Sequence, residues 1–437
     1  TRYLARLRAQ SEASPDPDLD LMLDLAAAHD RLAAVQAGFA KANRGDSADA
    51  EASIAEAERI RDVLVELIPD DSRLWLGIAM GAEQRGRVEQ AKGNFEEALT
   101  HGERGLEAVT RSDQLGAGDG ELDTVRVALL TLMGDIEHRL GQASDSAVIA
   151  SDHLRVAIGH FEAATDVVEA GNMVAGEVGL LGADLLARRA RSTTEIARWV
   201  IRDIQRGGGD DRAGDGPDLD DADRIAREGL ALVSASVAAY AVLREDDASA
   251  RDALRGMITT LREESLAWET LGRIAAQRGE DGGFAGDEAF ATSQEAYEFA
   301  QVLASDETDL DAQRLLGVMM NSVGNALRVK GRLDEAELLY DELIPLCRGI
   351  VATDPTTRYS RDLAIAVLKR AQIDEVRART LEGEEAVAFY EAAEVRYAEA
   401  GAIFEALAAE GIPMEREINE IVRVIERVRA AAAAIGG

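Results

Sequence analysis

The stretch WLGIAMGAEQRGRVEQAKGNFEEALTHGE, residues 75–103, decides the fold of this chain of 437 residues. Large and small apolar residues recur in it at intervals of about one helical turn. Counting from Trp75, the positions 3, 4, 7, 11, 16, 20 and 23 residues further on are Ile78, Ala79, Ala82, Gly86, Ala91, Phe95 and Ala98. This spacing predicts two helices joined by a turn at Gly86. Small residues let the two helices cross closely, and Trp75 and Phe95 fill the gaps between neighbouring pairs.

These offsets resemble those of the tetratricopeptide repeat (TPR), and the pattern returns along the chain. It is complete at Met320, Val323, Gly324, Leu327, Gly331, Ala336, Tyr340 and Leu343. A third copy has Leu130, Met133, Gly134 and Gly141, and after an insertion Ala157, Phe161 and Ala164. Weaker copies lie at 34–57, 181–182, 268–279 and 386–393. The resemblance implies helical hairpins that stack, because one such repeat cannot bury a core alone.

The chain is therefore expected to be all-α, a right-handed α-solenoid of about seven TPR-like helical hairpins with a C-terminal capping helix. Strand patterns are almost absent, and Ala, Leu, Glu and Arg favour helix. The hairpins are predicted at 19–70, 72–112, 121–170, 173–244, 247–305, 309–352 and 357–411. Residues 1–18 form a basic N-terminal segment and linker, 19–411 the solenoid, and 412–437 the capping helix and tail. Prolines fall between helices except Pro345, which is expected to kink or end one.

The opening TRYLARLRAQ carries three arginines and no acid. Two interpretations fit it: a targeting or docking peptide, or a frayed first helix before the linker. Because the chain begins with Thr1, either an initiator methionine was removed or the chain is part of a longer protein.

Composition excludes several classes of protein. With 48 basic and 82 acidic residues, the formal net charge is −34. Phosphates repel such a chain, so direct nucleic-acid binding is not expected. One cysteine excludes a disulfide scaffold. We find no run of about 18 apolar residues, since Val233–Leu243 is too short, and so predict no membrane span and a cytoplasmic location. Two explanations fit the acidic charge: the chain binds a basic protein partner, or it works in a salty cytoplasm where excess carboxylates keep a protein hydrated.

No chemistry-bearing motif is found. Cys347 has apolar neighbours and is interpreted as a buried core thiol. The five histidines lack zinc-ligand spacing, although His153 and His160 could share a helix face. The stretch LGAGDGELD (115–123) lacks the strand and the lysine of a phosphate loop and is interpreted as a connector. The acidic insertion 207–223 fails the calcium-loop spacing. The sequence therefore predicts no catalytic residue, no metal site and no cofactor.

In the family that the chain resembles, partners bind in the concave groove lined by the first helix of each hairpin. Carrying those positions over predicts nine groove residues: Thr131, Asp135, His138, Arg139, Glu269, Arg273, Asn321, Asn325 and Arg328. Asn and Arg side chains can hold a peptide backbone or a carboxylate. An ordinary solvated helix face accounts for these polar residues equally well.

The favoured function is a non-enzymatic scaffold that binds a protein or peptide partner in this groove. The alternative is a sensor or regulatory module that controls an effector subunit, such as a caspase-like protease or a nucleotide-dependent switch. A third reading, an α-helical hydrolase with paired carboxylates, lacks any constellation of acid, base and oxyanion donor.

Overall fold

The computed structural model describes residues 18–36, 47–170, 175–205, 218–245, 250–410, 412 and 414–436. These ranges contain fifteen helices and no strand. The helices are α2 (Leu19–Gln36), α3 (Ser47–Leu67), α4 (Ser72–Lys92), α5 (Phe95–Gln114), α6 (Asp119–Ala143), α7 (Ala147–Glu169), α8 (Ala175–Gln205), α9 (Leu219–Leu243), α10 (Ala250–Gln277), α11 (Gly283–Leu303), α12 (Leu310–Val329), α13 (Leu333–Thr353), α14 (Thr357–Ala378), α15 (Gly383–Ala409) and α16 (Glu415–Gly436). The predicted all-α class is confirmed.

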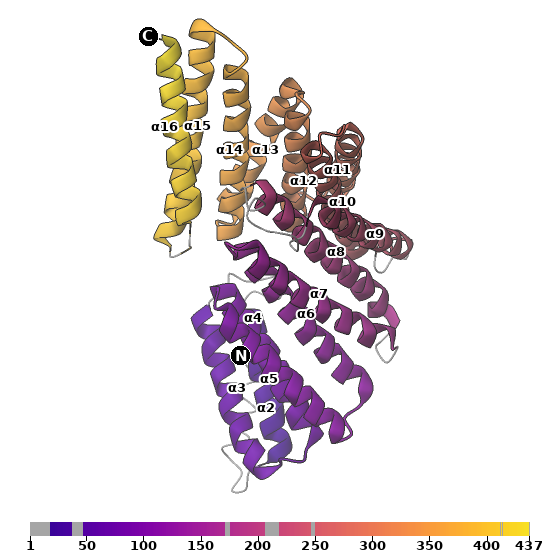
Figure 1. The fold of residues 1–437 in the computed structure, drawn as a ribbon. Coiled ribbons are helices and arrows are strands. Elements are labelled where there is room, and N and C mark those ends of the chain that lie inside the picture. The colour runs from indigo at the N-terminus through magenta and orange to yellow at the C-terminus, as the bar shows by residue number, and fades with distance from the viewer. Residues whose placement is uncertain are drawn as a thin grey trace. The chain divides into compact units, whose positions relative to one another are not determined.

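Consecutive helices pack as hairpins in six pairs of the described part, and α16 packs on α15: the pairs are α2/α3, α4/α5, α6/α7, α10/α11, α12/α13 and α14/α15. The contact between α8 and α9 includes a hydrogen bond of 2.7 Å from the Ser236 hydroxyl to the Ala183 carbonyl. Figure 1 shows α14, α15 and α16 side by side. Stacked hairpins of this kind are the building plan of an α-solenoid.

The helices group into two compact units, Thr1–Ala239 (unit 1) and Tyr240–Gly437 (unit 2), with the boundary inside α9. The sequence instead predicts one array over 19–411. The division into a basic segment, an array and a cap stays a prediction, and residues 1–17 lie outside the described part of the chain.

Short polar residues start several helices. The Asp71 carboxylate accepts the backbone N–H of Arg73 at 2.9 Å before α4, and Asp309 accepts that of Ala312 at 3.0 Å before α12. Such N-caps satisfy amides that have no partner inside the helix. The turn glycines Gly279 and Gly331 have φ values of +71° and +75°, a backbone conformation that residues with a side chain rarely adopt.

The predicted crossing of small and aromatic residues is confirmed in two hairpins. A Cβ added at Gly134 would lie 2.5 Å from the Phe161 ring, and one added at Gly324 would lie 2.7 Å from the Tyr340 ring. Both rings are buried, at 1% and 0% exposure. The missing side chain lets the aromatic ring reach the partner backbone, which sets the crossing of α6 with α7 and of α12 with α13.

In the second hairpin the predicted register is wrong. Gly86 is not a turn: α4 continues to Lys92, and the turn lies at Gly93, with φ of +85°. A Cβ at Gly86 would meet the Ala98 carbonyl at 3.3 Å, so Gly86 is the crossing point. The repeat pattern places this crossing at Ala79, seven residues earlier. Seven residues are two helical turns, so Ala79 and Gly86 lie on the same apolar face of α4. Gly141 likewise lies inside α6 rather than in a turn.

Pro345 was expected to kink or end a helix, and the expectation that it ends one is wrong. Helix α13 runs through it from Leu333 to Thr353. Leu343 before the proline and Cys347 and Ile350 after it are all buried in the core of unit 2. Packing on both sides outweighs the hydrogen bond that the proline removes.

The glycine-rich connectors are shorter than their sequences suggest. In LGAGDGELD only residues 115–118 lie between helices, because α6 begins at Asp119. After Gly279, the helix α11 begins at Gly283 and includes Phe284. Residues 207–217 of the acidic insertion lie outside the described part.

One helix of the described part, α9, passes the length and hydropathy test for a membrane span, with a mean hydropathy of 1.3 over its most apolar 18-residue window. The sequence-based prediction considered only Val233–Leu243. Of that window 28% is buried inside the protein, with Val233 and Ser236 fully buried, and one such helix is weak evidence for a membrane span.

Candidate functional site

A cavity lies inside unit 2, on the face made by the first helices of its hairpins. Helices α10, α12 and α14 surround it, and α13 closes its floor. Its volume is about 280 Å³. This is at the lower end of the range of small-molecule pockets, about 300–1,000 Å³, and suits one or two side chains of a larger partner. We call it the unit 2 cavity.

Apolar side chains make up much of the cavity wall. They come from α12, α13 and α14: Leu315, Val318, Leu343, Ile350 and Ile365. Gly317 keeps the floor open, because a Cβ there would lie 3.2 Å from Leu343 and 3.8 Å from the Cys347 thiol. The cavity therefore offers an apolar seat at a point where two helices of the same hairpin pack closely.

One ion pair crosses the cavity between α12 and α14. The Arg314 Nε donates to the Asp362 carboxylate at 2.6 Å, and the side chains are 19% and 24% exposed. A second donor, Nη2, lies 3.5 Å from the other oxygen. Each charge has its partner within the protein, so the pair holds the two helices together and leaves the cavity nearly neutral.

Asn321 lines the cavity and is oriented by Tyr340. The Tyr340 hydroxyl lies 3.1 Å from the Asn321 side-chain oxygen and 3.2 Å from its backbone carbonyl. Burial raises the pKa of Tyr340, so this hydroxyl stays protonated and donates. The amide oxygen of Asn321 is thereby occupied, and its N–H₂ group can donate to a ligand carbonyl. On the rim, Arg262 is 40% exposed and lies 3.1 Å from Glu263.

Cys347 is the predicted core thiol, and the structure confirms its burial at 6% exposure. Burial raises its pKa to about 12, with a further contribution from the nearby Asp362 carboxylate. The thiol therefore stays protonated at neutral pH, whereas a cysteine nucleophile needs a thiolate.

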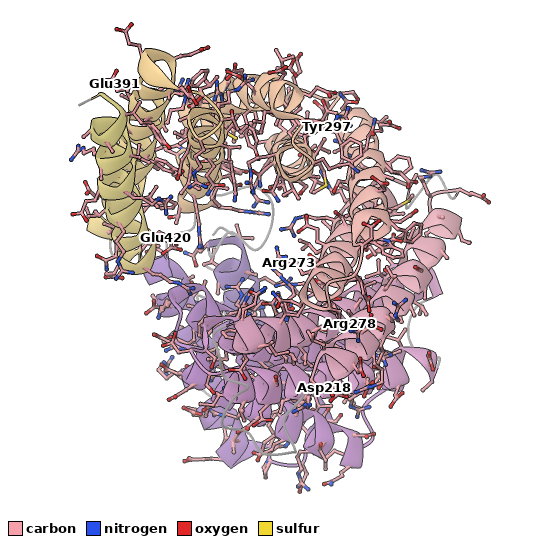
Figure 2. The ribbon with its side chains drawn as sticks, turned by 45° about the horizontal axis from the view of Figure 1, so that its top comes forward. Asp218, Arg273, Arg278, Tyr297, Glu391 and Glu420 are labelled. Atoms are coloured by element: carbon pink, nitrogen blue, oxygen red, sulfur yellow. The ribbon has the colours of Figure 1, made fainter. Side chains whose placement is uncertain are left out.

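The five groove residues predicted in unit 2 lie on α10 and α12, two of the four helices that line the cavity. Arg328 donates to the Asn325 side-chain oxygen at 2.9 Å, and Arg273 lies 3.8 Å from Glu269. Figure 2 labels Arg273 on α10 and Glu420 on α16, the first and last of the helices on this face.

Lys369 on α14 lies close enough to Arg328, Glu269 and Glu420 to interact with their charges. Burial lowers its pKa, as does the positive charge of Arg328, while Glu269 and Glu420 oppose the shift. The four side chains come from α10, α12, α14 and α16, so two cations on the middle helices lie between an acid on each outer helix. Only Asn321 of the five predicted residues lines the cavity itself.

The four groove residues predicted in unit 1 do not form a groove surface. His138 is 3% exposed and lies between α6 and α8. Its Nε2 accepts the Arg191 Nε–H at 2.9 Å, so Nδ1 carries the proton and donates to the Ser192 hydroxyl, also at 2.9 Å. Burial, reinforced by the Arg191 charge, lowers the pKa of His138 to about 2. His138 is a neutral packing residue, because helix α8 covers this side of α6.

The other three have different environments. Asp135 forms an ion pair with Arg188 of α8, whose Nε also donates to Asp184 at 2.7 Å. Thr131 is half-buried, and its hydroxyl has no hydrogen-bond partner in the described part of the chain. Arg139 is exposed. Asp135 therefore joins two helices, and only Arg139 is open to a partner.

His153 and His160 share α7, as predicted. The His153 Nδ1 lies 2.6 Å from the Glu137 carboxylate, while burial lowers the pKa of His160. Within the described ranges, no group of three or more His, Cys, Asp or Glu side chains has metal-binding geometry.

Sequence reasoning missed Arg314, Asp362 and the apolar wall of the cavity. A usable signal was present: the two residues of opposite charge, 48 positions apart, open successive first helices in DAQRLLG and YSRDLAI. Equivalent positions on neighbouring hairpins face each other in a stack. The spacing alone does not show that α12 and α14 leave a cavity between them.

No family model matches the sequence, and no curated protein matches it. Among solved structures, the chain is similar to the nuclear import adaptor Nro1, at 12% identity and a TM-score of 0.36, over 80% of this chain and 92% of that one. It is also similar to a STAND protein with a tetratricopeptide repeat sensor from Pyrococcus horikoshii, at 11% identity and a TM-score of 0.34. That match covers 97% of this chain, which spans about half (54%) of the STAND chain. A third similar structure is the TPR domain of P58(IPK), at 15% identity and a TM-score of 0.20, over 93% and 98% of the two chains.

Proposed function

We propose that this chain is a non-enzymatic scaffold of the long-period TPR type, which holds a peptide segment of a protein partner on the first-helix face of unit 2. One observation carries the proposal: an apolar cavity opens between α10, α12 and α14 beside an oriented amide. Apolar seats with a few placed polar groups are typical of peptide-binding sites.

In this proposal an apolar side chain of the partner enters the unit 2 cavity and contacts Leu315, Val318 and Ile365. The Asn321 amide donates to a backbone carbonyl of the same segment, and Arg262 on the rim binds a carboxylate. The charges of Glu269, Arg328 and Lys369 on the same face then select the flanking residues of the partner. The buried, protonated Cys347 supplies packing rather than chemistry.

The test is a selection of random 12-residue peptides displayed on phage against the full chain. We expect enriched peptides to share an apolar anchor residue. Val318→Trp fills the cavity and should weaken their binding about tenfold or more, because the anchor loses its seat. Affinities are measured by fluorescence anisotropy with labelled synthetic peptides.

Val329→Trp is the matched control, because it adds the same ring on the same helix at a position that is 72% exposed and outside the cavity. It should leave the affinity unchanged within about twofold. Failure to enrich any peptide, or equal binding by the Val318→Trp variant, would overturn the proposal.

A further inference from the structure

Unit 1 also has a concave surface. Unlike the unit 2 cavity, it is bordered by second helices of hairpins. The second helices α3 and α5 form its edges, and α4 forms its floor. Its volume is about 570 Å³. Apolar side chains line the bottom: Val65, Trp75, Ile78, Ala82 and Ala108. We call it the unit 1 groove.

The floor of the groove is fixed from below. Trp75 donates its indole N–H to the Pro69 carbonyl at 2.7 Å, which sets the plane of the ring. Under Gly81 lies the Arg61 guanidinium, bound to the Asp30 carboxylate of α2. A side chain at Gly81 would collide with Arg61, so this glycine is what lets the arginine pass beneath α4. The pair is neutral, and its side chains are only 6% and 4% exposed.

The edges of the groove carry charges that have no ion-pair partner among the residues that the structure describes. On α3, Glu58, Asp62 and Glu66 make no ion pair within the described part of the chain, and neither does Glu107 on α5. The one lining cation in the same condition is Arg104, because Arg111 lies 3.0 Å from Asp70. Burial and the Arg85 charge lower the pKa of His101, which leaves it neutral at pH 7. The uncompensated charge is therefore negative and lies mainly along α3.

The spacing of these acids indicates an elongated partner. Glu58, Asp62 and Glu66 are four residues apart and lie on one side of α3, so they extend along roughly 12 Å of helix at about 1.5 Å per residue. This is about two turns of a second helix laid beside α3. An apolar floor with an acidic edge of that length complements a helix that has an apolar stripe bordered by lysine or arginine.

We propose that the unit 1 groove binds a basic amphipathic helix of a protein partner. The apolar stripe of that helix lies on Trp75, Ile78 and Val65. Its basic residues pair with Glu58, Asp62 and Glu66, and Arg104 on the opposite edge repels a second basic flank. The helix is thereby held with its basic side toward α3. This site is independent of the unit 2 cavity, so either proposal can fail alone.

The probe is a labelled 16-residue synthetic helix with leucines on one stripe and lysines on its flank, measured by fluorescence anisotropy on the full chain. We expect saturable binding. Neutralising the α3 edge with Glu58→Gln, Asp62→Asn and Glu66→Gln together should weaken binding about tenfold, since three ion pairs are lost. Arg104→Glu should do the reverse and tighten it, because it removes the repulsive cation and adds a carboxylate.

The matched control removes the same charge elsewhere, with Glu384→Gln, Glu385→Gln and Glu391→Gln on exposed positions of α15 in unit 2 (Glu391 is labelled in Figure 2). It should change the affinity by less than about twofold. A lysine peptide with serines in place of the leucines should bind at least about tenfold more weakly, because it cannot use the apolar floor. Equal losses in the two triple variants, or equal binding of the serine peptide, would overturn the proposal.

Discussion

The unit 2 cavity and the unit 1 groove treat charge in opposite ways. In the cavity, Arg314 and Asp362 bind each other, and the open surface is mostly apolar. In the groove, the buried pair Arg61 and Asp30 lies beneath the floor, while the carboxylates of the α3 edge form no ion pair with any residue in the described part of the chain. A charge paired inside the protein acts on stability, whereas an uncompensated one acts on recognition. In the proposal for the unit 1 groove, the part of the net charge of −34 that lies along α3 serves to bind a basic partner.

The largest expected difference concerns the two ion pairs. Asp30→Ala leaves the Arg61 charge buried without its carboxylate and should destabilise unit 1 by about 3–5 kcal/mol. Asp362→Ala should cost unit 2 only about 1–2 kcal/mol, because Arg314 keeps some access to water. Hydrogen exchange followed by mass spectrometry reads the two units separately. Equal losses of stability in unit 1 and unit 2 would contradict this difference between the two ion pairs.

Acidification should also separate the units, because all five histidines lie in unit 1. The folded pKa of His138 is about 2, below its ordinary value of 6.5. Below pH 6.5 the unfolded chain therefore binds a proton that the folded chain does not, and stability falls as the pH falls. From pH 7 to pH 5 the loss is about 2 kcal/mol.

Urea unfolding at the two pH values, followed by circular dichroism, measures this loss. His138→Gln keeps an acceptor for Arg191 and a donor for Ser192 but does not titrate, so it should show a smaller dependence on pH. If wild type and variant lose equal stability between pH 7 and pH 5, His138 is not the cause.

Salt should separate the two binding surfaces next. Between 50 and 500 mM NaCl, we expect the lysine helix to lose about tenfold in affinity for the unit 1 groove, because its contacts are exposed charge pairs. Peptides selected on the unit 2 cavity should lose less, about threefold, because their anchor is apolar and only the contacts with Arg262 and the flanking charges respond to salt. Anisotropy titrations of both peptides on the same protein preparation give the two slopes, and parallel slopes would contradict the distinction.

The smallest expected effect concerns a residue that the sequence predicts for the groove. Arg273 is 52% exposed and only 3.8 Å from Glu269, so Arg273→Ala should change stability by less than about 0.5 kcal/mol. It should change the affinity for cavity peptides by less than about twofold. Asn321→Ala, which removes the oriented amide, should weaken them about fivefold, the equivalent of one hydrogen bond. If Arg273→Ala weakens the peptides more than Asn321→Ala does, the peptide binds nearer to α10 than we propose.

The sequence predicts the helical hairpins well because each crossing needs local contacts. Gly134 with Phe161 and Gly324 with Tyr340 are pairs within one hairpin, and the spacing of small and aromatic residues encodes them. The register of the second hairpin was wrong because Ala79 and Gly86 are both small and lie two turns apart. Periodicity alone cannot choose between them.

The candidate sites were predicted less well, since they depend on how neighbouring hairpins pack. His138 was expected in the groove, but α8 covers it, and no residue near His138 in the sequence encodes that contact. Asn321 lines the cavity, but its role as a donor stays a prediction and depends on Tyr340, 19 residues away. The α3 edge lies on a second helix, a face that the family resemblance does not point to.

The position of Cys347 has a practical consequence. It is the only cysteine of the chain, and it lines the unit 2 cavity. Because this thiol is 6% exposed and its pKa is raised to about 12, a thiol-reactive reagent should attack it only slowly in the folded chain. Local unfolding of unit 2 exposes the same thiol, so the rate of labelling of the native chain would report how often this part of unit 2 opens.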